Sequence, residues 1–221
     1  MRLEFTILTH EINLIMKNFL FSIFFFILYV SLYANEGKVI KLKGKVTVKR
    51  AETELILQKD TVLKIGDILQ TDKGGFAKVS FLDHTLYVFS NSQLTLTADK
   101  KKEKIQIEQK KGSSWYKVSP LLKKQSFSVK TPSAVAGVRG TGFIVSVMND
   151  LVSSVCVCKG EVEVEAGGKK VLLKKGVGAK LMKDTPPLDV HSNFSRISKP
   201  RLLKRNKDCM GCHSDLGNLY D

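Results

Sequence analysis

The sequence has few of the residues from which catalytic sites are usually built. It contains four histidines, four cysteines and one tryptophan among 221 residues. One of the histidines, His10, precedes the apolar run near the N-terminus. Neither a Ser-His-Asp set nor a pair of carboxylates can be identified from the spacing of the other candidates. We therefore expect a protein without catalytic activity.

Long hydrophobic runs are also scarce, and the single clear one lies near the N-terminus. Phe19 to Ala34 is a stretch of sixteen residues without a charge, and Lys17 precedes it. A basic residue, a short apolar run and a small residue at its end are typical of a secretory signal. The pattern predicts that residues 1–34 form a signal helix that is cleaved after Ala34.

An uncleaved anchor is the alternative interpretation of the same run. Residues 18–34 would then hold the protein in the inner membrane, although a spanning helix needs about 20 apolar residues. Met16 is an alternative start to Met1, because Met16-Lys17-Asn18 resembles an ordinary signal beginning. Both interpretations predict that residues 36–221 lie outside the cytoplasm, in the periplasm.

Acidic residues are in the minority. Lysine and arginine number 36 against 21 aspartates and glutamates, which gives a net charge of +15. An exported protein with this charge is expected to meet an anionic component of the cell envelope or an envelope protein rather than nucleic acid. The alternative is that the lysines only form solvated faces of the fold.

Helical periodicity is absent between Gly37 and about Met182. Apolar and polar residues alternate there with a period of two, as in strands with one buried face. The alternation places Ile40, Leu42 and Val46 on the buried side. Glycine, aspartate and asparagine separate the segments, and these residues favour turns. The pattern predicts an all-β domain over residues 36–182.

Two segments of this region resemble each other. Lys43 to Val48 matches Lys159 to Val164, and in both copies an apolar triplet follows eleven residues after the glycine. Lys111-Gly112, followed by Trp115, is a weaker third copy. Recurring strand–glycine–strand units predict short stacked β coils or a rolled sheet. Trp115 and Tyr116 are expected at the core and edge of such a coil.

The C-terminal tail carries the most specific chemical motif, Cys209-Met210-Gly211-Cys212-His213. Two thiols at this spacing with an adjacent histidine are typical of covalent c-type haem attachment. Cys209 and Cys212 would form the thioether bonds, and His213 would be the proximal ligand of the iron. The alternatives are a small disulfide loop, half of a zinc site, or an unused remnant.

The sixth ligand of such an iron is not evident from the sequence, since no methionine follows His213. His191 and Met182 are the upstream candidates, and His191 is favoured because it lies on the tether before the motif. An open site or a ligand from another subunit is the alternative. An imidazole would give a low potential, whereas a thioether would raise it.

Cys156 and Cys158 form a second pair, on a predicted strand. Side chains at i and i+2 of a strand point the same way, so a disulfide between them has poor geometry. The repeat aligns them with Ile40 and Leu42, which predicts that both thiols are buried in the core. A zinc site with four thiolates, including Cys209 and Cys212, is the alternative.

Three glycines at positions 137, 140 and 142 resemble the spacing of a phosphate-binding loop. Such a loop precedes a helix, whereas the residues after Gly142 have the pattern of a strand. The glycines are therefore expected to form a tight corner, with Arg139 paired locally.

The β region resembles the FecR domain over roughly residues 37–182. The residues that carry the resemblance are Gly44-x-Val46-x-Val48, Leu63-x-x-Gly66-Asp67-x-Leu69-x-Thr71, Ala77-x-Val79-x-Phe81-x-Asp83, Phe127-x-Val129-x-Thr131-Pro132-x-Ala134, Val138-Arg139-Gly140-Thr141-x-Phe143-x-Val145 and Gly160-x-Val162-x-Val164. His84 departs from the family, which usually has glycine there. We therefore expect His84 to lie near a turn and to be dispensable for folding, so that replacing it by glycine holds or slightly raises stability.

The resemblance implies an extracytoplasmic module of short β coils. Well-understood members of this family relay signals from an outer-membrane transporter to a cytoplasmic sigma factor. Seventeen residues precede the run that starts near Asn18, too few for a sigma-binding domain, so a sigma factor is not the expected partner. The sequence after the β coils has a linker over 183–200 and a CxxCH tail over 201–221, with one short helix or irregular chain, in place of the family's docking domain.

Taken together, the sequence predicts an exported binding or sensing module that carries one haem c. The haem would transfer an electron to a redox partner or sense redox state or a gas. The alternative is a non-redox periplasmic scaffold or partner-binding protein in which the CxxC cysteines form a disulfide.

Overall fold

The computed structural model describes the backbone of residues 16–17, 21, 37–99 and 103–191, with side chains up to 187. The chain divides into two units, Met1–Glu36 and Gly37–Asp221. Within the described ranges, no helix has the length and apolar content needed to cross a membrane. Apart from residues 16–17 and 21, the predicted signal helix lies outside the described residues, and so does the whole of the predicted C-terminal tail.

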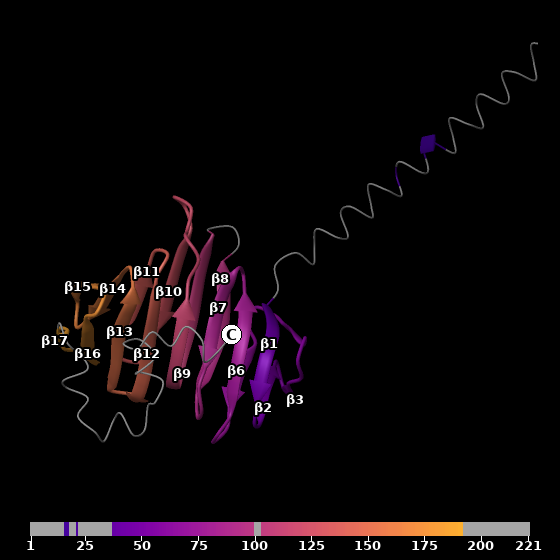
Figure 1. Ribbon diagram of the computed structural model, residues 1–221, viewed down its shortest axis with the longest axis horizontal. Helices are drawn as coiled ribbons and strands as arrows, with labels where there is room; N and C mark the ends of the chain where they lie inside the picture. Colours follow the sequence, from indigo (N-terminus) through magenta and orange to yellow (C-terminus); the bar gives the residue numbers. More distant parts are fainter. Residues whose placement is uncertain (1–15, 18–20, 22–36, 100–102, 192–221) are drawn as a thin grey trace, which may run out of the picture. The chain divides into compact units, whose positions relative to one another are not determined.

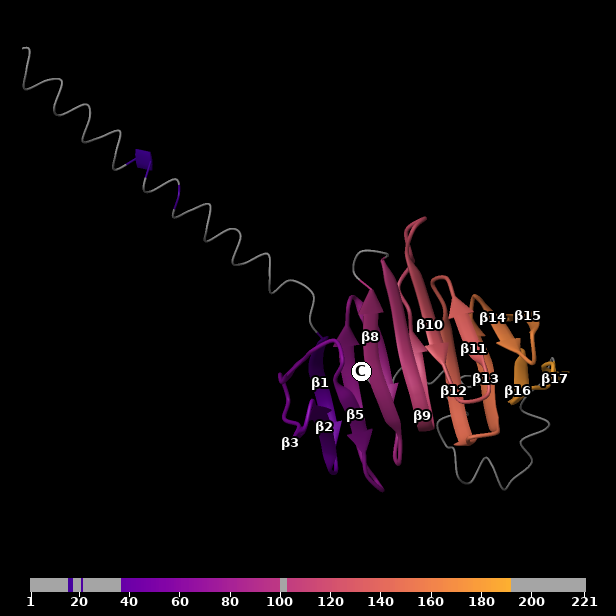
Figure 2. The ribbon, with the colours of Figure 1, turned by 180° about the vertical axis from the view of Figure 1, so that it is seen from behind.

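The second unit is built from strands in two layers, which confirms the all-β prediction (Figures 1 and 2). Sheet A has the order β4 (Val62–Leu63), β1 (Gly37–Lys43), β6 (Phe76–Phe81), β7 (His84–Val88), β9 (Lys104–Lys117), β12 (Gly142–Asn149), β13 (Val152–Lys159), β16 (Gly178–Met182) and β17 (Leu188–His191). Sheet B has the order β3 (Thr53–Ile56), β2 (Val46–Arg50), β5 (Ile68–Thr71), β8 (Gln93–Asp99), β9 again, β10 (Ser126–Lys130), β11 (Val135–Val138), β14 (Glu161–Ala166) and β15 (Lys169–Lys174). β17 falls in the range in which the sequence predicts a linker, so sheet A continues past Met182.

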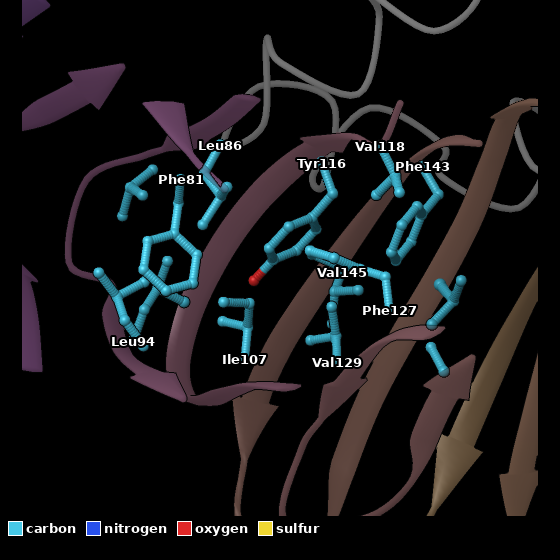
Figure 3. Packing of buried hydrophobic residues seen from close by; sticks show 14 of the residues in the cluster. Phe81, Leu86, Leu94, Ile107, Tyr116, Val118, Phe127, Val129, Phe143 and Val145 are labelled. Atoms are coloured by element: carbon cyan, nitrogen blue, oxygen red, sulfur yellow. The ribbon is translucent and has the colours of Figure 1, made fainter. Parts of the chain in front are cut away.

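Period-two alternation explains which side chains fill the space between the sheets. Valine, leucine and phenylalanine from both sheets form one buried cluster, shown in part in Figure 3. The prediction for β1 was correct for Leu42, which packs against this cluster, but wrong for Ile40, because a bulge lies between Val39 and Lys41. Val39 is fully buried, whereas Ile40 keeps 38% of its surface exposed. A bulge reverses the phase of the alternation, and the sequence pattern alone does not reveal it.

The two similar segments occupy equivalent places at the two ends of the sandwich. β1 leads to β2 through Gly44, and β13 leads to β14 through Gly160. Both glycines have positive φ, at 66° and 80°, where the chain passes from sheet A to sheet B. Left-handed backbone of this kind favours glycine, which explains why the repeat retains it.

The weaker third copy, Lys111-Gly112, lies where strand β9 passes from sheet B to sheet A. Residues 104–111 of β9 pair with β8 in sheet B, and residues 112–117 pair with β12 in sheet A. Gly112 lies at the change, with φ of 78°. A Cβ atom there would lie 2.5 Å from the carbonyl oxygen of Asn91 and would also collide with Ser92. The crossing therefore depends on a residue without a side chain.

A buried polar network stabilises this crossing from inside the core. The Tyr116 hydroxyl donates to Oε1 of Gln109 at 2.7 Å, and Nε2 of Gln109 donates to the carbonyls of Gly112 and Val145 at 2.8 and 3.1 Å. Both side chains are fully buried, and burial raises the pKa of the Tyr116 phenol far above its usual range. The Tyr116 ring stacks on Phe143, with the two centroids 5.2 Å apart (Figure 3). Because each polar atom has a partner, the network fixes β9 against β12 rather than weakening the core.

The aspartate of the Gly66-Asp67 motif also has a structural role. Asp67 is 1% exposed and accepts two hydrogen bonds from Arg50, at 2.8 and 2.7 Å. It also accepts the backbone N–H of Lys64 at 2.8 Å. A bidentate pair with a further donor satisfies a buried carboxylate, and here it ties the β4–β5 turn to β2.

The structure corrects the sequence-based view of His84. The turn between β6 and β7 consists of Leu82 and Asp83, whose φ angles of 47° and 66° suit a two-residue hairpin. His84 is the first residue of β7, and it is 4% exposed. Its Nδ1 accepts the N–H of Ser119 at 3.2 Å, and its ring packs edge-on against Phe127 at 5.1 Å. His84 therefore has specific partners, and it does not occupy a position that requires glycine.

Replacement of His84 by glycine is accordingly expected to destabilise the β unit by about 1–3 kcal/mol. The change leaves the half-buried N–H of Ser119 without its acceptor and removes the buried ring that packs on Phe127, and together these losses cost about that much. Urea unfolding of the two proteins measures the difference. Unchanged or increased stability would contradict this role of His84.

His84 also predicts how stability depends on pH. Burial lowers the pKa of its imidazole, and the charge of Asp83 opposes this effect in part. The unfolded chain therefore binds a proton at a higher pH than the folded chain does. The contribution is fully present above the unfolded pKa of about 6.5 and is lost as the pH falls toward the lower folded pKa. The wild type should lose more stability than His84→Gln between about pH 7 and pH 5, as measured by urea unfolding at each pH.

Candidate functional site

A row of seven residues crosses the face of sheet A that points away from the core. Its members, each paired with the next across neighbouring strands, are Lys78, Tyr87, Trp115, Ile144, Cys156, Gly178 and His191. We call this set the outer row. Since neighbouring strands lie about 4.8 Å apart, the row is roughly 29 Å long. Figure 1 shows its strands, from β6 to β17, following one another across the sheet.

Strand alternation shows that the row faces outward. Leu86, Tyr116 and Val145 lie next to row members along their strands, and all three belong to the buried cluster between the sheets. Successive side chains of a strand point to opposite faces. From Tyr87 to Cys156, the outer row is therefore a line of apolar side chains on the second face of sheet A.

Aromatic contacts organise the first half of the row. Tyr87 and Trp115 stack with their ring centroids 4.6 Å apart, and Nζ of Lys78 lies 5.3 Å from the centre of the Tyr87 ring. Stacking and a cation over an aromatic face are both favourable contacts. Nε1 of Trp115 is buried and has no hydrogen-bond partner within the described ranges. A buried indole N–H ordinarily has an acceptor, so the row presents a donor that suits one.

The side chains in the middle of the outer row are buried, although they point away from the core between the sheets. Tyr87 is 5% exposed, Ile144 is 4% exposed and Cys156 is 3% exposed. Each described strand belongs to sheet A or sheet B, so none of them forms a third layer over these side chains. The outer row therefore has the character of a docking surface rather than of a solvated face.

The two cysteines of β13 behave differently from each other. Cys156 is a buried thiol, as predicted, but it lies on the outer face of sheet A rather than in the core. Cys158 is half-buried and is disulfide-bonded, which corrects the expectation that both thiols are buried and unmodified. It falls in a bulge of β13, opposite Gly142 and Phe143. A disulfide at Cys158 also excludes the zinc site with four thiolates.

The predicted haem-attachment residues, Cys209, Cys212 and His213, lie outside the described residues. The two candidates for the sixth ligand are placed by the backbone. His191 pairs with Gly178 at one end of β16, and Met182 ends the same strand and pairs with Val152. Four residues of a strand correspond to about 13 Å, so the two candidates mark separate places on sheet A.

No cluster of three or more potential metal ligands occurs within the part of the chain that the structure describes. A shallow hollow of about 260 Å³ is lined by residues 131–135, 165–168 and 183–184. The hydroxyl groups of Thr131 and Ser133 that border it bond to Ser153, and Thr131 also closes the turn to Ala134. The Thr-Pro motif thus has a structural role.

The corner at Gly140 was predicted correctly, because φ is 68° there and β12 follows directly. Arg139, however, has no ion pair among the described residues. Local pairing of this arginine was therefore a wrong prediction. The strand after the corner agrees with the argument against a phosphate-binding loop.

The sequence does contain a signal for the outer row, although alternation alone does not reveal it. Leu86-Tyr87-Val88, Phe143-Ile144-Val145 and Val155-Cys156-Val157 are unbroken apolar triplets. A strand with apolar residues at both odd and even positions has apolar side chains on both faces, and such a strand is typically covered on both sides. Trp115-Tyr116 belongs to the same class, with Tyr116 in the core and Trp115 in the middle of the sheet's outer face.

Comparison with known proteins gives one family. Residues 67–163 match the family model described as FecR protein. None of the curated proteins compared with this sequence matches it. Two crystal structures, at 2.50 and 1.65 Å resolution, of a "putative anti-sigma factor" from Parabacteroides distasonis ATCC 8503 are similar in fold; each is 17% identical over 56% of this chain and 57% of that chain, with a TM-score of 0.49. The chain thus spans little more than half the length of that protein, and its residues 67–163 form a FecR family domain.

Proposed function

We propose that the chain is an exported sensing or binding module built on its FecR domain, without catalytic activity of its own. The FecR family match over residues 67–163 supports a sensing or binding role. The outer row supports it as well, because a line of aromatic and apolar side chains on the second face of a sheet is suited to contact with another polypeptide.

The finer proposal is that the tail carries one haem c. The observation that carries it is the spacing Cys209-x-x-Cys212-His213. The two thiols would hold the porphyrin covalently, and His213 would ligate the iron from one side. Haem c supplies a one-electron couple and, where a coordination position is open, a site for a diatomic gas. Electron transfer to a redox partner, or sensing of redox state or a gas, follows from that chemistry.

The predicted export signal and the net charge support a compartment outside the cytoplasm and an anionic partner. Residues 1–34 would deliver the chain to the periplasm, or residues 18–34 would anchor it in the inner membrane. The net charge of +15 favours an anionic component of the envelope or an acidic envelope protein as the partner.

The visible spectrum of the full chain, expressed together with a haem-c maturation system, tests the haem proposal. A sharp α band of the ferrous protein, and a mass increased by one haem after denaturation, are expected. A colourless protein with unmodified cysteines from the same cells would refute it.

The sixth ligand gives a separate prediction. If His191 ligates the iron, the haem protein is low-spin, and His191→Ala should convert it to a high-spin form that binds carbon monoxide quickly. Met182→Leu is the matched control and should leave the spectrum unchanged. A wild-type protein that is already high-spin and binds carbon monoxide at once would contradict ligation by His191.

A second candidate function is a non-redox scaffold or partner-binding protein of the envelope. The disulfide at Cys158 favours it, because disulfides are typical of proteins that work in an oxidising compartment outside the cytoplasm. Protein from a haem-competent host that has the mass of an oxidised, haem-free chain would support the scaffold over the haem carrier.

A further inference from the structure

We propose that, in the haem-free protein, residues 192–221 dock on the outer row and are held there by a disulfide between Cys158 and either Cys209 or Cys212. This inference does not depend on the haem proposal. It assigns an occupant to the outer face of sheet A, and it assigns a second role to the cysteines of the CxxCH motif.

The choice of partners for Cys158 follows from elimination. The chain has four cysteines, at positions 156, 158, 209 and 212. Cys156 is two residues away on the same strand, so the Cβ atoms of the two residues are roughly 6.6 Å apart, whereas a disulfide requires about 3.5–4.5 Å. Since Cys158 is disulfide-bonded, an intramolecular partner must be one of the two cysteines of the tail.

The burial of the outer row indicates that something covers it. Tyr87, Ile144 and Cys156 are between 3% and 5% exposed, although they point away from the core and no described strand lies over them. The buried N–H of Trp115 has no acceptor in the described part of the chain. A segment lying across the row would cover the apolar side chains, and one of its backbone carbonyls would accept from Trp115.

The position and length of the tail favour it as this segment. His191, the last described residue, is itself the end of the outer row, in register with Gly178 and through it with Cys156. The thirty residues that follow are ample, since fewer than ten extended residues cover the row's roughly 29 Å. Cys156, two residues before Cys158, lies only two strands, or about 10 Å, from His191, and seventeen residues lie between His191 and Cys209.

The bond forms by an ordinary exchange of thiols. The thiol of Cys158 and one thiol of the tail lose two protons and two electrons, and the disulfide of an exported oxidant takes up the electrons and becomes a dithiol. The sulfur that is bonded to Cys158 cannot at the same time form a thioether with a haem vinyl group. A dithiol reductant reverses the step and restores both thiols of the CxxCH motif.

A peptide map of the full chain, isolated without haem from an oxidising compartment, tests the pairing. The protein is alkylated, digested without reductant and analysed by mass spectrometry. A cross-linked peptide that contains Cys158 and either Cys209 or Cys212 is expected, and it should persist in Cys156→Ser. A Cys209–Cys212 loop, a link between two chains, or four alkylated thiols would each overturn the proposal.

Trp115 reports the docking separately, because it is the single tryptophan of the chain. Reduction of the wild-type disulfide should shift its fluorescence emission to longer wavelength and increase its quenching by acrylamide. Cys158→Ser should resemble the reduced protein without added reductant, and its emission should not change when reductant is added. Emission that is the same before and after reduction of the wild type would overturn docking on the row, whether or not the Cys158 variant folds.

Discussion

Replacing Gly112 by alanine should destabilise the β unit by about 2–6 kcal/mol. A residue with a side chain is strained at a φ of 78°, and this strain alone costs about 1–3 kcal/mol. The added Cβ would also meet the backbone of Asn91 and Ser92 inside van der Waals distance, and overpacking costs about another 1–3 kcal/mol. Because domains of this size are stable by only about 5–15 kcal/mol, urea unfolding should show a large shift of the midpoint.

Gly176 provides a matched control. Its φ is 81°, close to that of Gly112, but a Cβ there meets no atom within 4 Å. Gly176→Ala should therefore cost only the backbone strain. If the two variants are destabilised equally, close contact at the crossing of β9 is not what selects glycine at position 112.

Replacement of both Cys209 and Cys212 by alanine should abolish covalent haem attachment completely while the β unit stays folded. Without the two thiols no thioether forms, so haem staining of the denatured protein should disappear. Among the described residues, the core between sheets A and B is filled by buried side chains that run from Val39 to Leu181. Unfolding should therefore remain a single cooperative transition.

Cys156→Ser is the control for this experiment, since it removes a thiol of β13 and should keep the haem stain. Loss of cooperative unfolding in the double variant would mean that the tail is part of the structural core. A double variant that still stains for haem after denaturation would mean that attachment does not use the CxxCH motif.

The fold class could be predicted from the sequence because its signals are local. Alternation along each strand, and glycine at positions such as 44 and 160, depend on a few neighbouring residues and on the backbone angles that these permit. The division of the strands between two sheets depends instead on contacts between distant segments, such as β10 with β9 and β11 with β14. A single sequence carries no direct record of those pairings.

The errors in the sequence-based predictions have particular physical causes. The bulge in β1 places Ile40 on the outer face of sheet A. Cys156 was predicted to lie in the core because it aligns with Ile40, so that prediction was wrong for the same reason. His84 was predicted to lie at the turn because the family usually has glycine at that position. The residues with positive φ are Leu82 and Asp83 instead, so the turn ends before His84. The outer row emerged only when the register between strands brought Tyr87, Trp115 and Ile144 side by side.

Strand β9 belongs to both sheets, and it therefore connects the two halves of the β unit during folding. Strands β1–β8 pair with one another on one side of it, strands β10–β17 do so on the other, and within the described chain the pairings that join these halves all involve β9. Each half has an edge that pairs with β9, so neither half is complete until β9, which ends at Lys117, is in place. Folding therefore requires contacts between residues far apart in the sequence and should be slow. Once β9 is in place it couples the two halves, and a perturbation near Gly112 should lower the protection of backbone amides from hydrogen exchange in both halves alike.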